Sequence, residues 1–307
     1  MKVRKVTKDH FVLVYKGEVI GGFDGRATTL ASSQARRVVP SLTLTRTYLR
    51  ASGVPVPPTA KFSPHQYEAA LRHFRAQEGE VIVSGERKVP GFVARVGIVS
   101  EEEFNRAWER EEKAAGSKPK GSQQILLTST QPGLPVRVLV VGESVAAAVV
   151  RIPLHVIGDG DRTVLQLADA EVSRREECSY LAKRQPAIDE DALRAESIEP
   201  GQVLPYGQVQ RLSSSVQGGS DGRISVDVTD DLAAEIAELA VDAMWAIPGL
   251  AAAAVDLIVP SLDSGEAATV IGISAAPDIS EFRYPAYGSN RHPHRALMRH
   301  LMGTMQD

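Results

Sequence analysis

Short segments of continuous or alternating apolar residues recur along the chain and predict β-strands. Two of them flank Lys16-Gly17 within residues 11–23, which is typical of a hairpin. Another pair, residues 136–141 and 145–152, is joined by the short polar turn GES and predicts a second hairpin. Further strands are predicted over residues 80–84, 92–99, 125–128, 223–228, 252–259 and 268–274.

Between the strands, apolar residues spaced by three and four positions predict helices. Ser100 with Glu103 forms a capping box, and Thr229 precedes two aspartates that suit the first turn of a helix. The predicted helices cover residues 27–39, 42–51 and 294–305 and segments opened by Ser63-Pro64, Ser100, Thr163 and Thr229. Helices mixed with neighbouring antiparallel hairpins indicate an α+β protein of two lobes rather than a doubly wound parallel sheet.

The polar, Pro- and Gly-bearing stretch over residues 114–124 is the best candidate for a boundary between lobes. We place the boundary between a small lobe (57–118) and a large lobe (119–307) in this stretch. Residues 1–56 form an N-terminal lead region.

Composition narrows the classes of partner. The 307 residues carry a formal net charge of −3 without an acidic or basic block, which gives no electrostatic case for nucleic acid or a membrane surface. No apolar run reaches the roughly 18 residues of a membrane span, and no secretory leader is visible, so we expect a cytoplasmic protein. Four cations within residues 2–8 are expected to lie on a solvated, frayed terminus. Cys178 is the one cysteine and is expected to be incidental.

The turn Gly158-Asp159-Gly160 separates a predicted strand from a predicted helix. Taken alone, it suits either a tight turn or an anion-binding loop. Its surroundings resemble the ATP-grasp domain of cyanophycin synthetases and of the fused bacterial glutathione synthetases. The matching positions are Arg137, Leu139, Val140, Val141, Gly142, Arg151, Pro153, His155, Val156, Gly158, Asp159, Gly160 and Thr163.

Residues 47–57, 218–232, 253–259 and 273–279 resemble further motifs of the same family, so the likeness covers nearly the whole chain. It implies a two-lobed ATP-grasp-like fold with a central cleft and mainly antiparallel sheets. It also implies an activity that joins a carboxylate to an amine through an acyl phosphate made from ATP, with magnesium bound by oxygen ligands. Relatives of this kind often form homo-oligomers.

The resemblance also assigns candidate site residues. Asp256 falls on a metal position and, with Arg151, is a catalytic candidate. Because Asp256 lies mid-strand among apolar residues, its carboxylate needs a partner, such as Arg151, a bound cation or a hydroxyl. The nucleotide-binding candidates are Arg137, Gly158, Asp159, Gly160, Arg211, Gly218 and Gly219.

Several positions depart from the family pattern. Leu42, Ser84, Thr128, Gly272 and Ser274 stand where the family places charged or metal-binding groups, while Arg46 falls on a later lysine. These losses favour a catalytically inactive protein that serves as a structural or assembly subunit, with ATP and magnesium bound weakly or not at all. One alternative is an active ligase with replacement carboxylates, for which Asp263, Glu266 and Asp278 are candidates. A second alternative is a nucleotide or small-ligand binder without chemistry.

Overall fold

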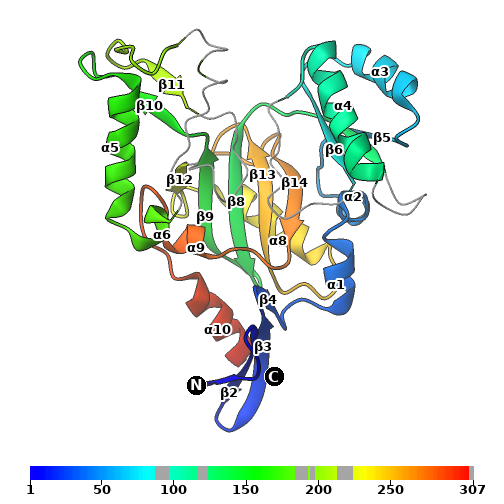
Figure 1. Ribbon diagram of the computed structural model, residues 1–307. Helices are drawn as coiled ribbons and strands as arrows, with labels where there is room; N and C mark the ends of the chain where they lie inside the picture. Colours follow the sequence, from blue (N-terminus) through cyan, green and yellow to red (C-terminus); the bar gives the residue numbers. More distant parts are fainter. Residues whose placement is uncertain (87–96, 117–123, 184–192, 194–197, 213–223, 304–307) are drawn as a thin grey trace.

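The structure is a computed structural model that describes residues 1–86, 97–116, 124–183, 193, 198–212 and 224–303 (Figure 1). It comprises a small lobe and a large lobe, with an N-terminal β-sheet projecting from the large lobe as an arm. Within the described ranges, every helix falls short of the length and apolarity needed to cross a membrane.

The arm is a four-stranded antiparallel sheet in the order β1-β2-β3-β4. The predicted hairpin is confirmed, with Lys16 and Gly17 both at positive φ in its turn. The prediction of a frayed N-terminus is wrong for residues 2–5, because β1 pairs along its whole length with β2. The side chains of β1 are exposed, as expected. The strands are β1 (Lys2–Lys5), β2 (His10–Tyr15), β3 (Glu18–Asp24) and β4 (Ala27–Thr28).

Two helices follow the arm, α1 (Ser33–Val38) and α2 (Leu42–Ala51). The first begins later than residue 27 because Ala27–Thr28 pairs with β3 and Ser32 caps the helix with its side chain. The second is confirmed at both ends, with Ser41 as its N-cap. Leu49 and Val54 bury their side chains in the core of the large lobe.

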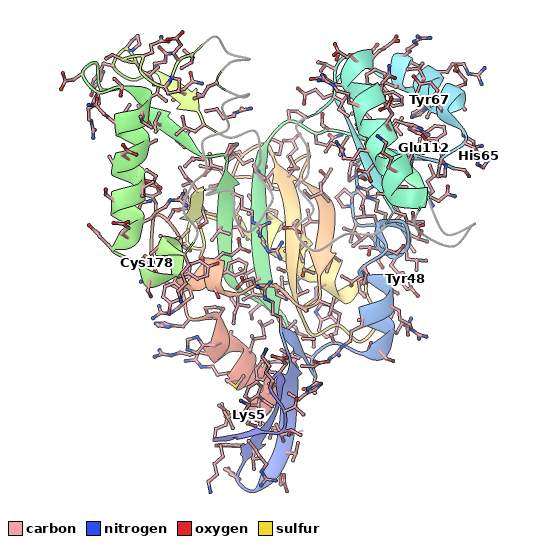
Figure 2. The ribbon with its side chains drawn as sticks, viewed as in Figure 1. Lys5, Tyr48, His65, Tyr67, Glu112 and Cys178 are labelled. Carbon is pink, nitrogen blue, oxygen red and sulfur yellow. The ribbon has the colours of Figure 1, made fainter. Side chains whose placement is uncertain are left out.

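The small lobe is a three-stranded antiparallel sheet, order β5-β7-β6, packed against two helices. Its elements are β5 (Thr59–Phe62), α3 (Tyr67–Arg75), β6 (Val81–Gly85), α4 (Glu101–Gly116) and β7 (Ile125–Ser129). The capping box of Ser100 and Glu103 is confirmed. By contrast, α3 begins after Gln66 rather than at Ser63. Figure 2 labels Tyr67 and Glu112 on these helices.

The boundary at residue 118 therefore needs correction. The strand β7 pairs with both β5 and β6, and its Ile125 and Leu127 belong to the small-lobe core. The small lobe extends to Ser129 for this reason. The strand predicted over residues 92–99 and the loop before it lie mostly outside the described residues.

The large lobe is organised around a five-stranded antiparallel sheet in the order β12-β9-β8-β13-β14, as predicted for its hairpin and last two strands. One face packs against α8 and the other against α9, α10 and the arm (Figure 1). Its elements are β8 (Leu134–Val141), β9 (Ser144–Ile152), β12 (Ile224–Asp227), α8 (Ala234–Trp245), β13 (Ala252–Val259), β14 (Thr269–Ser274), α9 (Ser280–Arg283) and α10 (Pro293–Gly303).

A smaller group of elements, here called the flap, extends from β9. It contains β10 (His155–Ile157), α5 (Val164–Glu176), α6 (Ser179–Ala182) and β11 (Val209–Arg211), with β10 and β11 paired antiparallel. The start of α5 at Thr163 is confirmed, because Thr163 and Gln166 form a reciprocal capping box. Cys178 lies at the junction of α5 and α6 (Figure 2).

Thr229 does not cap a helix. Helix α8 begins at Ala234, and the Thr229 hydroxyl instead accepts a hydrogen bond from the Ala148 backbone N–H (2.9 Å) and donates one to Asp227 Oδ1 (2.6 Å). Thr229, which the sequence predicts to cap a helix, thus provides the hydrogen-bond acceptor for a backbone amide of β9.

We predict that Thr229→Val lowers the free energy of unfolding by about 1–3 kcal/mol, because the Ala148 amide loses its acceptor. Thr229→Ser keeps the hydroxyl and is expected to stay within about 0.5 kcal/mol of the wild type. Chemical denaturation of both variants measures the difference, and equal stability of the valine and serine variants would contradict the assignment.

Candidate functional site

Strand register brings the charged candidates together on one face of the large sheet. Arg137 on β8 lies directly opposite Asp256 on β13, and Arg151 lies on the adjacent strand β9. Their neighbours Val136, Val150 and Val255 point to the opposite face, into the core under α8. Because side chains alternate along a strand, all three charged side chains face α9 and α10.

A fourth residue, Glu281 of α9, completes a cluster of two guanidiniums and two carboxylates, here called the ion cluster. Arg137 Nη1 donates to both Asp256 oxygens, at 2.7 and 3.0 Å. Arg151 donates to both Glu281 oxygens, at 2.6 and 3.0 Å, and its Nη1 lies 3.5 Å from Asp256 Oδ1. Arg137 Nε lies 3.1 Å from Glu281 Oε1, an ion-pair contact without the angle of a hydrogen bond. Each arginine therefore contacts both carboxylates.

The ion cluster is shielded from solvent and formally neutral. The exposed fractions of its side chains run from 5% for Glu281 to 18% for Asp256. Burial alone would lower the pKa of Arg137, but Asp256 and then Glu281 outweigh it, so the net shift of that pKa is upward. Removing one partner of such a buried set leaves an uncompensated charge, which costs about 3–5 kcal/mol.

Sequence reasoning found three members of the ion cluster and missed Glu281. The sequence left Arg151, a bound cation and a backbone or hydroxyl group open as partners of Asp256; in the structure both arginines contact it, and Arg137 makes the shorter contacts. Glu281 sits in a short helix whose first turn is fixed by a hydrogen bond from the Ser280 backbone N–H to Asp278 Oδ1 (3.0 Å). The only sequence signal for Glu281 is that it precedes Phe282, which is fully buried. The helix has four residues, too few to show a repeating apolar pattern that would predict burial of Glu281.

The Gly158-Asp159-Gly160 turn is held by its own hydrogen bonds. The amides of Gly158 and Gly160 donate to Gln208 and Leu204 carbonyls, at 2.8 and 3.1 Å. Asp159 Oδ1 accepts from the Asp161 and Arg162 backbone amides, and Oδ2 accepts from the Arg162 side chain. The Arg162 backbone bond contributes most to lowering the Asp159 pKa. This geometry favours the tight-turn alternative, since the amides of Gly158, Gly160, Asp161 and Arg162 already have acceptors.

Of the remaining nucleotide-binding candidates, the structure describes only Arg211. Arg211 lies on β11 of the flap, opposite His155, and its side chain is exposed. Gly218 and Gly219 lie outside the described residues. Beside the flap, a groove of about 500 Å³ runs between α5 and β10, lined by apolar residues such as Val156 and Leu167 and by Arg162 and Arg174.

Four positions that depart from the family pattern lie in the two sheets, two on β14 beside Asp256 and two in the small lobe. Gly272 lies directly opposite Asp256, and Ser274 lies opposite Ala254 on the same face. In the small lobe, Ser84 and Thr128 are buried in the sheet of β6 and β7. None of these four residues supplies a charge.

These residues do not fit a magnesium site. The Asp256 oxygens accept from Arg137, the neighbouring strand offers Gly272 and Ser274 in place of carboxylates, and magnesium needs oxygen ligands near ideal octahedral geometry. Asp263 and Glu266 lie in the exposed turn after β13. Among the described residues, no group of three or more histidine, cysteine, aspartate or glutamate side chains is arranged to hold a metal.

Two curated proteins are similar to this chain, whereas no family model matches it. The bifunctional glutathione biosynthesis protein GshAB of Mannheimia succiniciproducens is 26% identical over 269 residues, covering 83% of this chain and 32% of that protein. The corresponding protein of Pasteurella multocida is 24% identical over 257 residues, covering 78% and 31%. The chain thus spans about a third of the length of these curated relatives.

Solved structures give the same picture of the fold. The bifunctional glutathione synthetase from Pasteurella multocida superposes with a TM-score of 0.68 at 20% identity, over 99% of this chain and 41% of that one. A D-alanine–D-alanine ligase from Bacillus anthracis gives 0.51 at 9% identity, over 90% and 70%. The ATP-grasp ligase PsnB with its minimal precursor gives 0.50 at 15% identity, over 90% and 63%. The chain therefore has the ATP-grasp fold, with the two lobes and mainly antiparallel sheets that its sequence predicts.

Proposed function

We propose that this chain is a catalytically inactive protein with a ligase-like fold, which serves as a structural or assembly subunit in a homo-oligomer or a larger complex. The observation that carries the proposal is the ion cluster. Arg137 and Arg151 occupy the oxygens of Asp256 and Glu281 on the sheet face where the resemblance places magnesium.

The electrostatics of this face support the proposal. Transfer of a phosphoryl group requires cations arranged around the phosphates, and most of its catalysis is positioning and charge stabilisation. Here the two arginines are neutralised by two carboxylates at 2.6–3.5 Å, so a triphosphate would have to displace those partners to use them. Ser84 and Thr128 add no charge from the small lobe.

The similar proteins act as glutathione biosynthesis enzymes or as ligases, and the alternative function for this chain is an ATP-dependent ligation of a carboxylate to an amine. That alternative needs replacement metal ligands. The candidate Asp278 already accepts a hydrogen bond from the Ser280 backbone N–H (3.0 Å) and pairs with Arg26 at 3.2 Å.

We predict that the protein releases no ADP from ATP above background, with or without magnesium and candidate amino acids. We also predict that its melting temperature in MgATP does not exceed that in ATP with a chelator, because no set of residues in the described part of the chain fits the metal. A ligand at 100 times its Kd stabilises a native state by about 2.7 kcal/mol, so thermal melting would reveal tight metal-dependent binding. Amine-stimulated ADP release would establish the ligase alternative instead, and a magnesium-dependent shift without ADP would establish a nucleotide binder.

A second prediction concerns the ion cluster itself. Asp256→Asn is expected to lower the free energy of unfolding by about 3–5 kcal/mol, because two buried guanidiniums then share one carboxylate. The loss is expected to be the same with and without magnesium. Asp263→Asn, in the exposed turn after β13, serves as the control and should change stability by less than about 0.5 kcal/mol. A magnesium-dependent stabilisation that Asp256→Asn abolishes would contradict the proposal.

A further inference from the structure

The outward face of the arm is apolar, although it lies open to solvent. A sheet with one face in water usually alternates apolar and polar positions, whereas β2 is apolar throughout Phe11–Tyr15. One face of the arm is covered, because Leu13 and Ile20 pack in one cluster with residues of α10. The side chains of Val12 and Val14 alternate with Leu13 and therefore lie on the other face, where they stay partly exposed.

The strand register arranges this outward face in rows. Lys2 of β1 lies opposite Val14 of β2, which in turn lies opposite Val19 of β3. Arg4 lies opposite Val12 in the next row. Directly opposite residues of an antiparallel pair share a face, so the basic edge of β1 borders three valines. The side chain of Val19 is 65% exposed, which shows that this face is uncovered at β3.

The valines continue into a groove at the end of α8. Val19 lines this groove of about 510 Å³ together with Trp245 and Leu250. Trp245 is the last residue of α8 and is 51% exposed. Single exposed apolar residues are common on monomers, whereas contiguous ones mark interaction surfaces, and tryptophan is enriched among the residues that contribute most to binding.

Acidic residues continue from Trp245 along α8. Asp242 precedes Trp245 by three positions and Glu238 precedes Asp242 by four, so the three side chains share the exposed face of the helix. Helix α8 contains no lysine or arginine, and β1 contains no acidic residue. Within the described part of the chain, neither these acids nor the cations of β1 form an ion pair. One surface thus carries unpaired charges of opposite sign at its two ends.

We propose that this surface binds a second copy of the chain in a two-fold symmetric dimer. We call it the arm surface, and it is formed in order by Lys2, Val14, Val19, Trp245, Asp242 and Glu238. A two-fold axis that crosses this line at its centre, in the plane of the interface, reverses the direction of the line. The basic end of each copy then meets the acidic end of the other, and the apolar centres meet each other.

The order of the charges favours a second copy over other partners. A nucleic acid or an anionic membrane carries one sign of charge, and it would be repelled by the acids of α8 while it bound the cations of β1. A second copy supplies both signs in the reverse order and covers the outward face of β2. The inference rests on one part of the proposed function, the homo-oligomer, and is independent of catalytic inactivity.

The first test is the mass of the protein in solution, measured by sedimentation velocity at micromolar concentrations. We expect the wild type to form a species of twice the 33.0 kDa mass of one chain, and its dimer Kd to rise with salt concentration. Val19→Asp places a charge in the apolar centre and should raise the dimer Kd at least roughly tenfold. Because Val19 is exposed, the near-UV circular dichroism of the variant should match that of the wild type.

Charge reversal tests the order of the two ends. Lys2→Glu combined with Arg4→Glu places acids against acids and should raise the dimer Kd roughly tenfold. Glu238→Lys combined with Asp242→Lys should raise it by a similar factor. All four substitutions together exchange the signs at both ends and should return the Kd to within roughly threefold of the wild type.

A matched control reverses two exposed acids elsewhere. Glu109→Lys combined with Glu112→Lys, on α4, should keep the wild-type Kd. A monomeric wild type would overturn the arm surface and the homo-oligomer together. A dimer that Val19→Asp leaves intact, or that the fourfold variant fails to restore, would overturn the arm surface and leave the homo-oligomer standing. Release of ADP by a dimer with these properties would contradict the proposed inactivity alone.

Discussion

The pairing of β8 with β13 is the constraint on which the centre of the large lobe depends. It sets Arg137 opposite Asp256, and the charge of each makes the burial of the other tolerable. Arg151 and Glu281 extend the same neutralisation to β9 and α9, so three strands and a helix are connected through one ion cluster. A slip of one residue in this register would turn Arg137 into the apolar core under α8, which holds the register in place.

The fold was largely predictable because its strands and helices follow local hydrophobic periodicity. The strands over residues 136–141, 145–152, 252–259 and 268–274, and the start of a helix at Thr163, are confirmed. The errors share a cause. Thr229, the pairing of β7 and the contacts of Glu281 depend on residues distant in sequence, which local patterns do not encode. The candidate site shows the same limit. Local patterns predict the strands that carry Arg137 and Asp256, but the contact between the two side chains depends on how these distant strands pair.

The buried arginines of this protein have two kinds of hydrogen-bond partner, carboxylates in one place and hydroxyls in the other. In the ion cluster, carboxylates surround the guanidiniums and leave no net charge. At Arg46 the protein supplies hydroxyls alone. The first arrangement connects β8, β9 and β13 to α9 through charged side chains.

The arm has a consequence for how the chain folds as it leaves the ribosome. Leu13 and Ile20 of the arm bury their side chains in one cluster with Leu297 and Leu301 of α10 (Figure 1). The first hairpin is synthesised long before its packing partner exists. Until α10 has been synthesised, the apolar face of the hairpin stays exposed or is covered by a chaperone, since contacts of large sequence separation form last.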